Sequence, residues 1–369
     1  MAIAYLEFAC LWYNRAMMLV IDGDYGEGGG QILRTSLTLA AILTQPIQID
    51  NIRAKRKNPG LAAQHLTAVR AAAMICEARL VGDRLGSTQL VFEPHRPPIA
   101  GFYEFDVAEA REGGSAGAAS LVLQTVLLPL ALAGDTSTVT VKGGTHVAWS
   151  PSFHYLHDVY LAVLNQLGLQ ATAELLAWGW YPAGDGEIKA TVPGANHVSA
   201  GHSASLGPER GPLKQIKGVA VASSLPAHIA QRMRDRAMNL LASAGLPAAI
   251  EPQRVRSVSP GAGIFLAAEY EAGLAGFSAL GQKGKPAEVV AEEAVNDLLA
   301  FHRSGAVLDI HLADQLILPF VLAEVTGSFS VERLSQHILT NIWVVEQFLG
   351  PTVEVDHKQN LIHFTPKDQ

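Results

Sequence analysis

The chain has 369 residues, of which 49% are hydrophobic and 17% are charged, and its formal net charge is -7 at pH 7. These values indicate a well-buried protein of two or three structural units. The negative charge argues against a protein that coats nucleic acid through general electrostatics, although it permits recognition of a single nucleic-acid end by a local basic pocket.

The chain gives no sign of a membrane or a secretory context. No apolar run reaches the roughly 18 residues needed to span a bilayer. Cys10 and Cys76 provide neither a disulfide framework nor a zinc-binding spacing, which favours a reducing, cytoplasmic location. Residues 1–16 are apolar without a basic start and precede Met17 and Met18. We expect them to come from an upstream start codon or to form a loosely held tail, the alternative being an extra edge element.

The order of predicted elements repeats along the chain. A first unit has a glycine-rich turn, a helix, a strand, a loop, a second helix and a hairpin. A second unit repeats this order, and a third repeats it from the first helix onward. Helices are predicted from length and apolar period, and strands from alternation and β-branched content. The units comprise, in order, 26–30, 31–43, 47–52, 53–60, 61–77 and 79–94; 113–117, 118–134, 138–141, 143–150, 151–167 and 170–193; and 310–325, 328–331, 332–337, 338–349 and 352–366.

A different pattern separates the second unit from the third, and it predicts a small inserted α/β domain. We expect an extension at 1–16, a core of 17–199 and 286–369, and an insert at 200–285. Arg232, Arg234 and Arg236 alternate on the insert helix, which favours a solvated helix face. The expected insert elements are strand 214–222, helix 226–244 and strands 248–256 and 263–270, with glycine- and serine-containing joints at 194–207 and 272–286.

Similar units placed around a pseudo-symmetry axis can bring matching loops together. Polar residues on the apolar first helices are costly unless they are paired or used, so Gln124 and Gln315 are either satisfied core amides or site residues. The strand-to-helix loops carry Arg53, Lys55 and Arg56, then His146, then His337; the first helices carry Arg34, then Gln124, then Asp314 and Gln315.

The glycine-rich run 26–31 ends a strand and opens a helix, so it is either a phosphate-binding loop or a plain tight turn. It matches neither the P-loop nor the dinucleotide-binding pattern. Glu27 within it can hold a divalent metal beside phosphates. The basic loop 53–60 is either a solvated turn or a phosphate contact, and Arg34, one turn into the helix behind the glycines, favours convergence on phosphate.

Two residues at predicted helix starts point to chemistry. Asp314 is either a carboxylate that orients an imidazole or binds a ribose, or a plain acidic residue favoured by the helix dipole. His337 lies between a predicted strand and the first turn of a helix, where the dipole disfavours the protonated ring. A neutral imidazole in that position can act as a nucleophile.

Seven motifs in order resemble the RNA 3'-terminal phosphate cyclase family, and they cover the chain from about residue 19 to 366. They are GEGGGQ (26–31), RAKRKNPGL (53–61), LVLQT (121–125), GGT (143–145), YPAG (181–184), HLADQ (311–315) and QHILTN (336–341).

The resemblance implies an α+β fold with three repeated αβ modules around a pseudo-threefold axis and one small inserted α/β domain. It implies that a histidine takes AMP from ATP, passes it to an RNA 3'-phosphate, and that the vicinal 2'-OH then closes a 2',3'-cyclic phosphate with release of AMP. ATP, RNA 3'-phosphate ends and Mg2+ or Mn2+ are therefore the expected partners.

The resemblance also implies roles for individual residues. The nucleophile is His337, and the metal-associated glutamate is Glu27. His311 stands where some relatives have a tyrosine, and its ring can replace that tyrosine on adenine. The residues similar to the ATP site are Gln124, His311, Leu312, Ala313, Asp314 and Gln315; those similar to positions tied to the terminal phosphate or to catalysis are Arg34, Arg53, Arg56 and Gln64.

Two other functions fit a repeated αβ architecture. A non-catalytic ribosome-assembly branch of the family lacks the histidine nucleophile, so the intact QHILTN segment argues against it. An enolpyruvyl transferase would need convergent basic residues but no histidine that forms an adduct, so labelling with ATP separates it from a cyclase.

Overall fold

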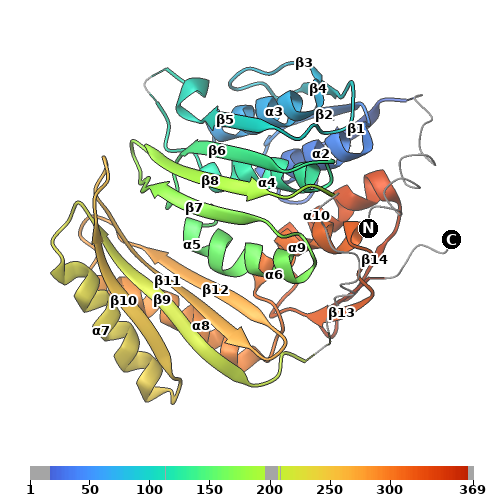
Figure 1. Cartoon of the computed structure of the whole chain (residues 1–369). Helices are drawn as coiled ribbons and strands as arrows, with labels where there is room; N and C mark the ends of the chain where they lie inside the picture. Colours follow the sequence, from blue (N-terminus) through green and yellow to red (C-terminus); the bar gives the residue numbers. More distant parts are fainter. Residues whose placement is uncertain (1–16, 113, 196–206, 208, 365–369) are drawn as a thin grey trace.

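The fold was analysed in a computed structural model, which describes residues 17–112, 114–195, 207 and 209–364 (Figure 1). The expected extension 1–16 lies outside the described residues. Within the described ranges, no helix combines the length and the apolar character needed to cross a bilayer.

The protein is a mixed α+β structure whose described strands form four small sheets (Figure 1). In two of them the strand orders are β1-β2-β4-β3 and β5-β6-β8-β7, each with a parallel first pair and antiparallel pairs after it. The strands are β1 (Leu19–Asp22), β2 (Ile47–Asp50), β3 (Arg79–Val81), β4 (Leu90–Glu93), β5 (Phe102–Asp106), β6 (Ser137–Gly143), β7 (Thr172–Ala177) and β8 (Gly186–Val192).

A third, three-stranded sheet has the order β13-β15-β14 and is antiparallel. Where the other two sheets have their first strand, this unit has a parallel bridge from Leu308 to Val331. The arrangement of the three units about one axis stays a prediction. The strands are β13 (Gly327–Ser330), β14 (Val353–Asp356) and β15 (Leu361–Phe364).

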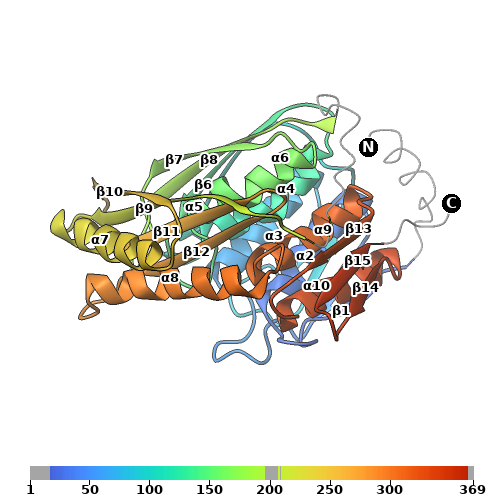
Figure 2. The ribbon, with the colours of Figure 1, turned by 90° about the horizontal axis from the view of Figure 1, so that it is seen from below.

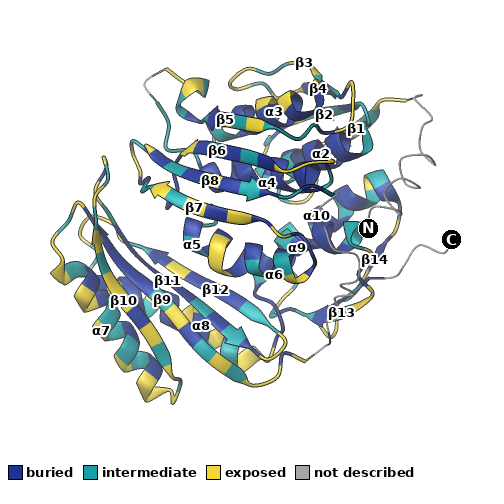
Figure 3. Ribbon diagram, in the orientation of Figure 1, coloured by how far each residue is buried: buried dark blue, intermediate teal, exposed yellow. Residues whose placement is uncertain are grey.

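Helices pack against one another on the inner side of these sheets and form the largest apolar core. α2 contacts α3, α4 and α10, and α10 also contacts α9. Figure 3 shows α2 and α4 buried along most of their length. The helices are α2 (Gly30–Leu43), α3 (Ala63–Cys76), α4 (Ala119–Ala131), α5 (Phe153–Tyr155), a π-helical turn (Leu156–Tyr160), α6 (Leu161–Gln166), α9 (Ile310–Leu322) and α10 (Gln336–Leu349), with a short 3-10 turn at Ala108–Ala110.

The fourth sheet, of order β10-β9-β11-β12, carries two helices on one face, and its other face looks toward α5 (Figure 2). α8 follows the boundary expected at residue 285, yet its apolar side packs in the same buried cluster as this sheet. The division of the chain into domains stays a prediction. The elements are β9 (Leu213–Ser223), α7 (His228–Ser243), β10 (Ala248–Val255), β11 (Gly261–Tyr270), β12 (Leu274–Leu280) and α8 (Ala287–Ser304).

One expectation for this part of the chain is wrong. The segment 272–286, expected as a joint, contains β12, which pairs with β11 along its length. The glycine within β12, Gly276, is explained by close packing, because a Cβ on it would lie 2.5 Å from the ring of Tyr155.

The expected solvated arginine face also carries ion pairs, and the side chains of Arg232, Arg234 and Arg236 are 49%, 38% and 41% exposed. Arg232 and Arg236 are one helical turn apart on α7 and pair with Glu288 and Glu292 of α8, at 2.7 and 2.6 Å. Arg234, on another side of the helix, pairs with its neighbour Asp235.

Buried Asp309 joins three parts of the molecule. Its carboxylate caps α9 by accepting from the backbone N–H groups of His311 and Leu312, at 2.9 and 3.0 Å. It also accepts the Tyr155 hydroxyl of the second unit at 2.9 Å and the Gly276 N–H of β12 at 3.0 Å. One side chain therefore ties the insert sheet to two units of the core.

Replacing Asp309 by alanine should destabilise the protein by about 2–4 kcal/mol, because several buried donors lose their acceptor at roughly 1–3 kcal/mol each. Urea denaturation would measure the loss. Asp356→Ala is the matched control, since Asp356 also accepts two backbone N–H groups but in an exposed turn. Equal losses in the two variants would show that Asp309 is not a structural junction.

Candidate active site

The glycine-rich loop between β1 and α2 lies against the start of α10. Gly26 has φ +56°, in the left-handed region, and a Cβ on it would lie 2.3 Å from the Thr340 hydroxyl oxygen. A Cβ on Gly29 would lie 2.9 Å from the Arg56 guanidinium. Glycine is therefore required here for close approach between the first and third units.

Glu27 and His337 meet across that contact. Glu27 Oε2 lies 2.7 Å from His337 Nδ1 and 3.4 Å from the Arg56 guanidinium. The other carboxylate oxygen, Oε1, has no hydrogen-bond partner among the described residues. One carboxylate thus faces the imidazole and keeps a free oxygen.

His337 is the second residue of α10, whose first turn is capped by Ser335 Oγ accepting from Ile338 N–H at 3.2 Å. Burial lowers the pKa of His337, and Arg34, His311 and Arg56 lower it further, whereas Glu27 opposes them. The ring is therefore neutral near pH 7. Because Nδ1–H donates to Glu27, Nε2 carries the free lone pair. A neutral ring with a free Nε2 can act as a nucleophile.

A buried network fixes α2, α9 and α10 relative to one another. The Thr35 hydroxyl donates to Asn341 Oδ1 at 2.7 Å, and Asn341 Nδ2 donates to the Asp314 carbonyl at 2.7 Å. Asp314 Oδ1 and Thr340 Oγ1 are buried without a hydrogen-bond partner among the described residues. Unsatisfied polar atoms of this kind are typical of a site that a ligand completes.

Asp314 and Arg34 form the charged part of the site. Burial raises the pKa of Asp314 to about 7, although Arg34 and a hydrogen bond from Asn341 act to lower it. Burial lowers the pKa of Arg34 to about 10, against the attraction of Asp314. Arg34 donates to Gln31 Oε1 at 2.7 Å, so its guanidinium is held in place.

The structure also brings Gln124 and Gln315 together. Gln124 Nε2 donates to Gln315 Oε1, and both line a cavity of about 50 Å³ with Arg34, Thr35 and Asn341. The two glutamines are satisfied amides that also border the site.

The remaining predicted site residues make other contacts, although His311 lies near enough to His337 to lower its pKa. Arg53 has φ +55° and donates to the Gly60 carbonyl of its own loop at 2.6 Å. Gln64 Oε1 accepts the Ala118 N–H at 2.8 Å, at the start of α4. Leu312 and Ala313 are buried in the apolar core, so only their backbone can meet a ligand. His311 is exposed at the start of α9.

His65 is a residue that we did not single out from the sequence. A Cβ on Gly30 would lie 2.3 Å from its Nε2, so the imidazole supports the glycine-rich loop from below. Burial, followed by Arg34 and Arg53, lowers the pKa of His65 to about 3. The sequence feature that could have identified His65 is its position directly after Gln64, a predicted site residue.

The second unit's loop histidine does not reach the site. His146 is buried, its Nε2 lies 2.9 Å from His154 Nδ1, and its ring stacks on Trp178 and Trp180. Phe265 of the insert sheet packs edge-on against it. The histidine of this loop therefore supports the junction with the insert.

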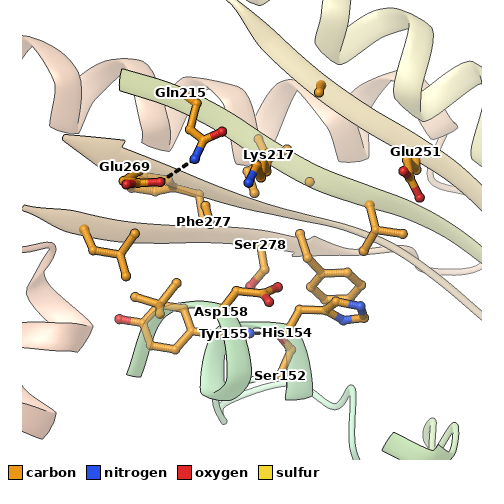
Figure 4. Close-up of a pocket in the computed structure, with 18 of the residues that line it drawn as sticks. Ser152, His154, Tyr155, Asp158, Gln215, Lys217, Glu251, Glu269, Phe277 and Ser278 are labelled. Atoms are coloured by element: carbon orange, nitrogen blue, oxygen red, sulfur yellow. Dashed lines mark hydrogen bonds between the residues drawn. The ribbon is translucent and has the colours of Figure 1, made fainter. Parts of the chain in front are cut away.

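A larger cavity, of about 510 Å³, lies between the π-helical turn and the open face of the insert sheet (Figure 4). None of the predicted site residues lines it. Its charged side chains are Lys217 and three carboxylates, Asp158, Glu251 and Glu269. This excess of negative charge disfavours binding of polyanions such as nucleotides and RNA in the cavity.

No cluster of three or more metal-ligating side chains occurs within the described ranges. A divalent ion at Glu27 would therefore have one carboxylate ligand from the glycine-rich loop. Such an arrangement suits Mg2+, which takes one or two carboxylates together with phosphate oxygens and water.

Comparison with known proteins agrees with the motif order. Residues 25–355 match the family model described as RNA 3'-terminal phosphate cyclase. Proteins of that name are similar along nearly the whole chain: in Gloeothece citriformis (51% identity, 95% of this chain, 99% of the relative), Methylococcus capsulatus (54%, 92% and 93%) and Nostoc punctiforme (52%, 94% and 98%). The chain belongs to the RNA 3'-terminal phosphate cyclase family.

Proposed function

We propose that the protein converts an RNA 3'-terminal phosphate to a 2',3'-cyclic phosphate at the expense of ATP, through an AMP adduct on His337. The supporting observation is the 2.7 Å contact between Glu27 and His337 Nδ1. It leaves Nε2 of a neutral imidazole as the nucleophile, at a helix start and beside arginines.

In the first step His337 Nε2 attacks the α-phosphorus of ATP. The N–P bond forms as the P–O bond to pyrophosphate breaks, and the ring acquires positive charge. Glu27, hydrogen-bonded to Nδ1–H, compensates that charge without moving. Arg34 offsets the phosphate charges, which in phosphoryl transfer matters more than proton transfer.

In the later steps the adduct passes AMP to the RNA 3'-phosphate. The oxygen of the phosphate replaces the histidine nitrogen, and the neighbouring 2'-OH then displaces AMP and closes the ring. The covalent adduct divides one difficult dehydration into easier transfers. We assign Gln124, Gln315 and the start of α9 to ATP, and Arg56, which pairs with Glu27, to the RNA 3'-phosphate.

The divalent ion implied by the family, Mg2+ or Mn2+, would be held by Glu27 through its free oxygen, and it would supply charge neutralisation.

We also propose that the three units lie about a pseudo-threefold axis, with residues 200–285 inserted between the second and third, and that the enzyme is cytoplasmic.

Changing His337 to alanine should abolish formation of a protein-linked label from α-labelled ATP. The wild-type adduct should be labile to acid and stable to base, as a phosphoramidate is. His363→Ala, in the β15 strand, is the matched control and should label normally. Labelling of His337→Ala at the wild-type level would refute the assignment of the nucleophile.

The rate of adduct formation should fall as the pH falls through the pKa of His337, because only the neutral ring attacks. That pKa lies below its ordinary value of 6.5, so the half-maximal rate should lie below 6.5. Single-turnover labelling across the acidic range would test this. A midpoint of the pH–rate profile near 7 that disappears in Asp314→Asn would instead reflect titration of the Asp314 carboxyl. A midpoint above 6.5 that persists in Asp314→Asn would contradict the prediction.

Arg56→Ala should slow transfer of AMP to RNA about ten- to a hundredfold, because a charge-assisted contact contributes roughly 1.5–3 kcal/mol. Arg53→Ala should act mainly on stability, since its guanidinium holds its own loop. A chase of pre-formed enzyme–AMP with 3'-phosphorylated RNA measures the transfer, and urea denaturation measures the stability. Normal transfer in Arg56→Ala, with failure to take up AMP, would place Arg56 in the ATP site.

A further inference from the structure

An aromatic pair lies at the outer end of the contact between the glycine-rich loop and α10. The rings of Tyr25 and Trp343 are stacked, with centroids 3.9 Å apart and an interplanar angle of 11°. Tyr25 is 44% exposed, whereas Trp343 is partly buried and packs against the apolar core. Burial alone does not account for the close stacking.

The stack is the first of three successive contacts. After Tyr25 on Trp343, Gly26 lies against Thr340 and Glu27 contacts His337. Positions 337, 340 and 343 are three residues apart and share one face of the helix. The loop therefore runs along α10 as a strap that ends at the nucleophile.

The opposite side of the strap is held by the basic loop. Lys55 Nζ donates to the carbonyls of Asp24 and Gly26, at 2.7 and 3.2 Å. These bonds restrain the loop backbone but leave its position along α10 open. Within the described contacts, Tyr25 on Trp343 supplies the side-chain packing that fixes this position.

We propose that Tyr25 and Trp343 are positioning residues for adenylylation, whose stacking holds the Glu27 carboxylate on Nδ1 of His337. The proposal rests on the function proposed above. It assigns neither ring a contact with substrate, because each acts through Glu27. A misplacement of about 1 Å in a reacting group can cost roughly a hundredfold in rate.

The test is a mutant cycle on the rate of the first step and on ATP affinity. Tyr25→Ala should slow adduct formation roughly tenfold while ATP affinity changes less than about twofold, because binding does not need an aligned imidazole. Tyr25→Phe keeps the stack and should restore the rate. In a Glu27→Ala background Tyr25→Ala should cause no further loss, since Glu27→Ala already removes the contact that the stack positions. Phe102→Ala, which removes a 90% exposed aromatic side chain far from the strap in sequence, is the control and should leave the rate unchanged.

Fully additive losses in the cycle would overturn the proposal, as would a wild-type rate in Tyr25→Ala. A crystal structure of Tyr25→Ala gives a readout that does not depend on activity. The expected result is a separated Glu27–His337 pair, and a contact retained at the wild-type distance would overturn the proposal. Failure of the proposed function would instead be seen as unchanged labelling of His337→Ala.

Discussion

The hydrogen bonds that join Thr35, Asn341 and Asp314 are the constraint on which the site depends. They are buried and link one residue on each of α2, α10 and α9. With these helices held together, the start of α10 lies beside the glycine-rich loop, where Glu27 contacts His337 and Arg34 is close enough to lower its pKa. Loss of the Asn341 amide would leave a buried hydroxyl and a carbonyl unpaired, which is costly in a packed interior.

Burial is the common cause of the unusual ionisation around this network. It lowers the pKa values of His337, His65 and Arg34 and raises that of Asp314. Charges in such an environment interact more strongly than charges in water. The same desolvation that keeps the imidazole neutral therefore strengthens the attraction between Arg34 and an incoming phosphate.

Much of this organisation is predictable from the sequence. Long apolar helices such as α2 and α10 lie within two residues of their expected starts, because burial of one face dictates their pattern. The repeat of elements predicts that the strand-to-helix loops of the units converge, and Arg56 and His337 of two of these loops both contact Glu27. The roles of residues that depend on backbone geometry are not predictable from the sequence in this way. Arg53 turns back on its own loop because of a left-handed residue that a string of basic letters does not reveal.

Elements that depend on distant partners were equally hard to predict. β5 and α8 fall in stretches for which we predict no element from the sequence. Three small residues of β12, Ala275, Gly276 and Ala279, are buried and allow close packing with its neighbours. The pairing of Arg232 and Arg236 with α8 required knowledge of where α8 lies.

The bond between Thr35 and Asn341 joins residues 306 positions apart. A growing chain carries the glycine-rich loop and its basic neighbours early, but the imidazole and the helix that aligns it arrive near the end of translation. An unfinished polypeptide therefore lacks the imidazole that we propose as the acceptor of AMP. Nascent or prematurely terminated chains would be chemically silent toward ATP, and modification of the enzyme would begin only when its last unit has docked on its first.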